Sequence, residues 1–96
     1  MLLDELREMR SQIEAACHQY GVRRIRVFGS VARGEEGPSS DIDFLVDLPR
    51  GYDMFTQRIP LQGQLMEITG HRLDVILEHE LNRHIRADVL KEAVDL

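Results

Sequence analysis

One alternating stretch constrains the fold of this chain more than any other feature of its sequence. In residues 41–47, the positions Ile42, Phe44 and Val46 alternate with Asp41, Asp43, Leu45 and Asp47. Because successive side chains of a strand point to opposite faces, this pattern predicts a strand with one buried face and one acidic face. Residues 72–77 repeat the pattern around Asp74. Two such strands need a layer of helices over their apolar face.

The segments around these strands predict an alternation of helices and strands. A further strand is expected over residues 24–28. Helices are expected over residues 2–20, from Ser30 to about Gly34, over 53–69 with a break at Pro60, and over 81–93, where Leu81, Ile85, Val89, Leu90 and Ala93 form an apolar stripe. The order α-β-α-β-α-β-α predicts an α/β (α+β) fold, a small mixed sheet with helices packed on one face. The buried side chains of this sheet would be Ile42, Phe44, Val46, Leu73, Val75 and Leu77, opposite a face that presents Asp41, Asp43 and Asp74.

Length and composition limit the classes of protein that fit. With 96 residues, the chain 1–96 is expected to be a single domain. The chain contains no run of about 18 apolar residues, so we expect no transmembrane helix and no membrane partner. A single cysteine, Cys17, excludes an internal disulfide and fits a buried thiol in a cytoplasmic protein. The net charge of −5 argues against direct nucleic-acid binding.

The acidic face carries the strongest chemical signal. Asp41 and Asp43 must point to the same side of their strand, and Asp74 joins them if the two strands are neighbours. Two carboxylates roughly 4 Å apart repel by about 4 kcal/mol at an effective dielectric constant of about 20, unless solvent or a cation screens them. Three carboxylates can hold two Mg²⁺ ions for a phosphoryl displacement.

A second signal lies where the 24–28 strand ends. A glycine at position 29 lets a phosphate approach the backbone. A helix capped by Ser30 would offer free amides to an anion, and Arg33 could bind phosphate or brace the loop. Gly29-Ser30 is followed by ten residues and then by Asp41-Ile42-Asp43. This spacing joins a phosphate-binding turn to a metal-binding strand.

The DNA polymerase β-like nucleotidyltransferase superfamily has a signature that this chain resembles in Val27-Phe28-Gly29-Ser30-Val31-Ala32-Arg33-Gly34 and Ser40-Asp41-Ile42-Asp43-Phe44-Leu45-Val46. The short chain and the strand around Asp74 are similar to the minimal nucleotidyltransferase (MNT) branch. The resemblance implies that Gly29 and Ser30 hold the triphosphate of ATP. It also implies that Asp41 and Asp43 ligate both Mg²⁺ ions, and that Asp74 ligates the catalytic metal and acts as the general base.

The same resemblance implies a biological role. Members of the MNT branch act as antitoxins of HEPN-domain toxins, and the implied activity is transfer of AMP from ATP to a tyrosine hydroxyl of the toxin. Two alternatives stay open. One is an antitoxin that neutralises by binding without chemistry, and the other is a small-molecule nucleotidyltransferase completed by dimerisation. The short chain leaves no room for an acceptor-binding domain, which favours an acceptor presented by a partner protein.

Several remaining residues are expected to have structural roles. Tyr52 and Phe55 could stack on a base, although core packing is the favoured interpretation. Arg10, Arg23, Arg24 and Arg26 are expected to be solvated. The four histidines show no spacing that suggests a metal site.

Overall fold

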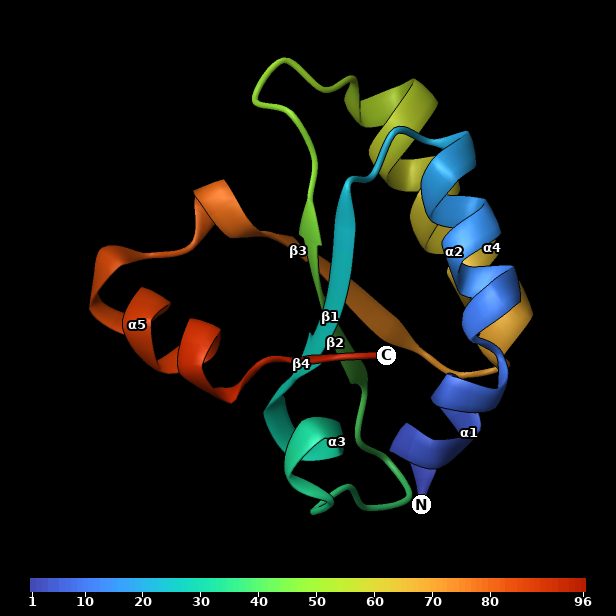
Figure 1. The fold of residues 1–96 in the computed structure, drawn as a ribbon, viewed down its shortest axis with the longest axis vertical. Helices are drawn as coiled ribbons and strands as arrows, with labels where there is room; N and C mark the ends of the chain where they lie inside the picture. Colours follow the sequence, from blue (N-terminus) through green and yellow to red (C-terminus); the bar gives the residue numbers. More distant parts are fainter.

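The computed structural model describes residues 1–96 and contains helices and strands that alternate along the chain (Figure 1). The elements are α1 (Leu2–Glu8), α2 (Arg10–Gln19), β1 (Arg24–Phe28), α3 (Gly29–Arg33), β2 (Ile42–Asp47), the π-helical turn η1 (Met54–Arg58), α4 (Ile59–Thr69), β3 (Leu73–Leu77), the 3₁₀ turn η2 (Glu78–Glu80), α5 (Arg83–Glu92) and β4 (Val94–Asp95). None of the helices combines the length and apolar character needed to cross a membrane.

The strands form one mixed sheet in the order β3-β2-β1-β4. β2 runs parallel to β3 and antiparallel to β1, and β4 pairs antiparallel with the other edge of β1. The predicted mixed α/β fold is therefore confirmed, but the expectation that all helices pack on one face is wrong, because α5 lies across the sheet from α2 and α4 (Figure 1). β4 was not predicted, because two residues are too short to show an alternating pattern.

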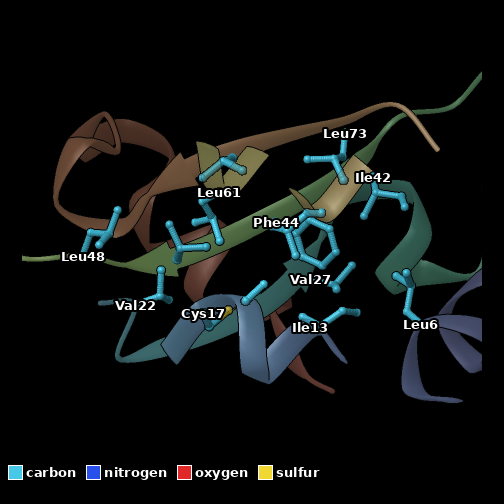
Figure 2. Close-up of a cluster of buried hydrophobic side chains, with 14 of the residues drawn as sticks. Leu6, Ile13, Cys17, Val22, Val27, Ile42, Phe44, Leu48, Leu61 and Leu73 are labelled. Carbon is cyan, nitrogen blue, oxygen red and sulfur yellow. The ribbon is translucent and has the colours of Figure 1, made fainter. Parts of the chain in front are cut away.

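The main core lies between the sheet and the helices α1, α2 and α4 (Figure 2). All six strand residues that were expected to be buried have relative exposures of 4% or less. Helix residues such as Leu6, Ile13, Leu61 and Leu65 are fully buried against them. Cys17 is also buried in this core, as expected, and burial raises the pKa of its thiol to about 11. The alternation in the strands therefore identified the buried face of the sheet correctly.

The helices differ from the predicted ranges in three places. The helix expected over 2–20 is interrupted at Met9, which has φ of −94° and ψ of 10°. No proline or glycine marks this interruption in the sequence. The break expected near Pro60 is confirmed, because η1 ends at Arg58 and α4 begins at Ile59. Pro60 lies in the first turn of α4, where a missing amide donor costs little. The last helix begins later than expected, because the side chain of Asn82 caps it by accepting a hydrogen bond from the His84 amide at 2.8 Å.

The position of α5 sets one side of the sheet apart from the other. Figure 1 shows α5 across the strands from α2 and α4. Of its predicted apolar stripe only Val89 is buried, whereas Ile85 is 51% exposed. The predicted stripe is therefore buried only at Val89, because α5 lies on the polar face of the sheet, which offers few apolar side chains for packing.

Candidate active site

Two of the predicted site residues lie directly side by side on the polar face of the sheet. Asp43 of β2 and Asp74 of β3 are partners in the parallel register. Partial burial and the neighbouring carboxylates of Asp74 and Asp41 raise the pKa of Asp43. Asp74 is exposed to solvent. The sheet thus concentrates negative charge at the beginning of β2 and β3, with one carboxylate open to an incoming molecule.

Asp41 immediately precedes β2 and supplies the third carboxylate. Its Oδ1 atom is buried and accepts no hydrogen bond, although Arg72 Nε lies 3.3 Å away as an ion-pair partner. A buried carboxylate oxygen without a hydrogen-bond donor is suited to a cation. As the side chains lie, no three histidine, cysteine, aspartate or glutamate residues form a set that could hold a metal ion. Asp41, Asp43 and Asp74 would therefore have to turn toward one another to share one.

Gly29 lies against this acidic cluster at the start of α3. Its φ of 75° is in the left-handed region that favours glycine. A Cβ atom at this position would lie 2.4 Å from Asp43 Oδ2, closer than two non-bonded atoms can approach. The glycine thus lets the turn after β1 come directly against the β2 carboxylate, and it joins the two sequence signals into one site.

The prediction that Ser30 caps the short helix is wrong. α3 begins at Gly29, so Phe28 occupies the cap position, and no side chain makes a capping hydrogen bond. Ser30 is instead the second residue of α3 and is half-buried beside Gly29. The tight turn at Gly29 lets the helix begin one residue earlier than the serine suggested.

Glu92 is a member of this region that the sequence did not reveal. It comes from the end of α5, and its Oε2 accepts a hydrogen bond from the Gly29 amide at 3.0 Å. Its Oε1 pairs with Arg33 Nη1, and Arg33 Nε donates to Glu35 Oε2 at 2.9 Å. The hydrogen bond from Arg33 lowers the pKa of Glu92. The Gly29 amide and Arg33 therefore already bind a carboxylate together.

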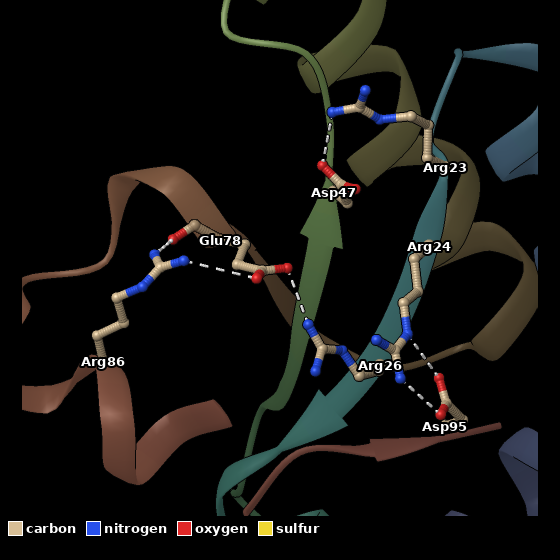
Figure 3. Close-up of polar contacts among 7 residues, drawn as sticks. All are labelled: Arg23, Arg24, Arg26, Asp47, Glu78, Arg86 and Asp95. Atoms are coloured by element: carbon tan, nitrogen blue, oxygen red, sulfur yellow. Dashed lines mark hydrogen bonds and ion pairs between the residues drawn. The ribbon is translucent and has the colours of Figure 1, made fainter. Parts of the chain in front are cut away.

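An ion-pair network connects α5 to the sheet on the same face (Figure 3). Arg26 of β1 was expected to be solvated, but it is only 9% exposed and donates from Nη2 to Glu78 Oε2 at 2.8 Å. Arg86 of α5 donates from Nη1 to the Glu78 carbonyl oxygen at 2.6 Å. The sequence prediction for Arg26 is wrong because alternation places it on the face that α5 covers.

The two aromatic residues near the end of β2 have different environments. Tyr52 packs partly against the core, as expected, and its hydroxyl donates to Glu80 Oε2 at 2.8 Å. Phe55 is 79% exposed, so the expectation that it packs in the core is wrong. It lies in the short turn η1, which leaves the side chain outside the layer of α2 and α4.

Comparison with known proteins places these features in a family. The nucleotidyltransferase domain family matches residues 9–96. A protein adenylyltransferase of Thermococcus cleftensis, MntA, is 38% identical over 76 residues, which cover 79% of this chain and 76% of that protein. A solved structure provisionally described as a minimal nucleotidyltransferase has 38% identity and a TM-score of 0.86, and the match covers 100% of this chain and 97% of the other.

A more distant structure shares the fold alone. It is described as a toxin–antitoxin with AMP-PNP, and it matches with a TM-score of 0.73 at 20% identity, covering 88% of this chain and 69% of the other. The family match spans β1, β2 and β3, so it includes Gly29, Asp43 and Asp74. On this match and on the close structural similarity, the chain belongs to the nucleotidyltransferase domain family.

Proposed function

We propose that this protein is a Mg²⁺-dependent adenylyltransferase that transfers AMP from ATP to a tyrosine hydroxyl of a HEPN-type toxin and so acts as its antitoxin in the cytoplasm. The observation that carries the proposal is that Asp43 is paired with Asp74 in the sheet and also lies directly against Gly29. The names of the relatives support it: one is a protein adenylyltransferase, and a structural neighbour is a toxin–antitoxin with AMP-PNP.

The three aspartates would divide the chemistry between them. Asp41 and Asp43 would hold two Mg²⁺ ions, and Asp74 would hold the catalytic one. Bound Mg²⁺ would stabilise the charge that develops on the attacking and leaving oxygens. The acceptor oxygen bonds to the α-phosphorus, the bond from that phosphorus to the β-phosphate oxygen breaks, and pyrophosphate leaves. Asp74 would take the proton of the acceptor hydroxyl, a role supported by its solvent exposure.

The turn after β1 would hold the phosphates of the nucleotide. Gly29 offers its amide at the start of α3, Ser30 offers a hydroxyl, and Arg33 offers a guanidinium group. In the structure, the Gly29 amide and Arg33 both donate hydrogen bonds to one anion, the carboxylate of Glu92. This arrangement supports an anion site beside the acidic cluster, as a metal-bound triphosphate requires.

Transfer to the partner tests the catalytic part of the proposal. The product of the neighbouring gene would be incubated with this protein, ATP and Mg²⁺, and its intact mass would be measured. We expect adenylyl additions that require Mg²⁺, and Asp41→Ala with Asp43→Ala should reduce the rate by at least about a thousandfold. Undiminished addition by the double variant, or no addition with any nucleotide, would contradict the proposal.

A neutralisation assay tests the biological part. Cells that express the toxin would be rescued by the wild-type protein and by the Asp41→Ala, Asp43→Ala variant in parallel. We expect rescue by the wild type only. Full rescue by the variant would show that neutralisation needs only binding, and transfer to a small hydroxyl compound with none to protein would favour a small-molecule enzyme.

A further inference from the structure

The carboxylate of Glu92 lies at the position where the proposed function requires a phosphate. It accepts the Gly29 amide at 3.0 Å and pairs with Arg33, which are the two donors assigned to the triphosphate. The Gly29 amide has only one hydrogen to donate, so it cannot bind Glu92 and a phosphate at the same time, and Glu92 also occupies Nη1 of Arg33. Glu92 and a bound nucleotide are therefore alternatives at this site.

Electrostatic repulsion between Glu92 and Asp43 favours the displacement of Glu92 by a nucleotide. The negative charge of Glu92 is among the causes that raise the pKa of Asp43, so the two carboxylates repel each other. The charge of Arg33 opposes this rise in the pKa of Asp43, and the hydrogen bond from Arg33 lowers the pKa of Glu92. A Mg²⁺–triphosphate would offer the same donors an anion and would also bring cations to the aspartates. The exchange thus removes a repulsion that the fold otherwise contains.

The surroundings of Glu92 allow its side chain to leave without unfolding the protein. The side chain is 26% exposed and lies at the end of α5, so it can turn into solvent. The backbone on either side is held independently. Arg86 and Glu78 anchor the beginning of α5, and Arg24 anchors β4 by two hydrogen bonds to Asp95 at 2.9 and 3.1 Å (Figure 3).

We propose that Glu92 is a built-in competitor of the nucleotide, which occupies the phosphate position until Mg²⁺-bound ATP displaces it. The inference rests on the proposed function, because it needs Gly29 and Arg33 to bind the triphosphate. Its consequence is that the apparent Kd for nucleotide equals the intrinsic Kd divided by the fraction of molecules in which Glu92 has left the site.

Nucleotide affinity measured by calorimetry tests this inference. The probe is an ATP analogue with a methylene group in place of the oxygen between the α- and β-phosphates, so that the bond broken in the proposed reaction cannot be cleaved, in the presence of Mg²⁺. Glu92→Gln keeps the shape of the side chain but removes its charge, so we expect the Kd to fall about tenfold.

The matched control is Glu35→Gln, which removes a charge that pairs with the same Arg33 but does not contact Gly29. Its Kd should change by less than about twofold. Thermal unfolding of each variant would establish that it is folded.

The other outcomes separate this inference from the proposed function. If the wild type binds the analogue and Glu92→Gln binds it equally or more weakly, Glu92 is a structural brace and the inference fails while nucleotide binding stands. Equal tightening by both variants would attribute the effect to net charge alone and would also overturn the inference. If neither the wild type nor Glu92→Gln binds the analogue, both the inference and the proposed function fail.

Discussion

At the scale of single residues, Gly29 joins the two halves of the site. Its positive φ turns the chain from β1 into α3, and its missing side chain leaves room for Asp43 Oδ2. Larger residues would be excluded twice, once by the backbone conformation and once by the carboxylate.

Comparison of this glycine with Gly70 separates the effect of the backbone conformation from that of the close contact with Asp43. Gly70→Ala is a matched control, because Gly70 has φ of 70° but nothing within 4 Å of a Cβ atom. We expect Gly70→Ala to lower the free energy of unfolding by about 1–2 kcal/mol. Gly29→Ala should cost more and should also abolish AMP transfer, since Asp43 would have to move. Chemical denaturation and a transfer assay would measure both effects. Equal destabilisation by the two variants, with full activity of Gly29→Ala, would contradict this account.

The site residues show which contacts a sequence can predict. Asp43 and Asp74 could be predicted because each lies on a strand whose alternation fixes its face, and the sheet needs only to place the strands together. Glu92 could not, because its contact with Gly29 spans 63 positions and depends on where α5 docks. The environment of Arg26 was missed for the same reason: its burial comes from an element that lies far along the chain.

At the scale of elements, the turn η1 depends on one carboxylate. Asp53 Oδ1 accepts hydrogen bonds from the amides of Phe55 at 2.8 Å and Thr56 at 2.9 Å. These hydrogen bonds, that from Thr56 foremost, lower the pKa of Asp53. The ionised form is thus favoured in the folded protein, so its contribution to stability is present above the unfolded pKa of about 3.9 and is lost as the pH falls through the lower folded value.

Two variants of Asp53 test this contribution. Asp53→Ala should lower the thermal midpoint at neutral pH by about 4–8 °C, the effect of a typical lost cap in a domain of this size. Asp53→Asn keeps an acceptor oxygen but cannot ionise, so it should preserve most of the midpoint at neutral pH and reduce the loss of stability below about pH 4. Thermal unfolding between acidic and neutral pH would measure both. An unchanged midpoint for Asp53→Ala would show that the cap is dispensable.

The connection between β1, η2 and α5 depends on a largely buried ion pair between Arg26 and Glu78. Arg26 is almost fully buried, and its Nε already has no hydrogen-bond partner, so Glu78 is its main compensation. Glu78→Ala should therefore destabilise the protein by about 3 kcal/mol. Arg26→Met with Glu78→Leu should cost clearly less, because no charge is left buried. Urea unfolding of the single and double variants gives the comparison, and a double variant as unstable as Glu78→Ala would refute the pairing argument.

Elements also differ in how well the sequence predicts them. The strands β1, β2 and β3 and the helix α4 follow from periodicity and from Pro60, since their core faces repeat at regular spacing. The interruption at Met9 and the strand β4 do not follow from it. Both depend on tertiary packing, and neither has a local residue that would mark it.

At the scale of the whole molecule, the acidic cluster lies on a part of the polar face that α5 leaves open at Asp74. Asp74 is exposed, and the apolar face of the sheet is fully used by the core beneath α1, α2 and α4. The described chain therefore provides the nucleotide side of a transfer reaction and little that would enclose an acceptor. This arrangement supports an acceptor that arrives on the surface of another protein.

The central claim is that Asp41, Asp43 and Asp74, with Gly29, form one catalytic site for AMP transfer. The most direct test is the rate of transfer from ATP by Asp74→Asn, compared with Asp47→Asn. Asp47 lies at the other end of β2 and pairs with Arg23 at 2.9 Å, so it controls for the loss of one carboxylate from the strands. We predict that Asp74→Asn lowers the rate by about a hundredfold or more, whereas Asp47→Asn changes it by less than about threefold. Transfer by Asp74→Asn at the wild-type rate would contradict the account.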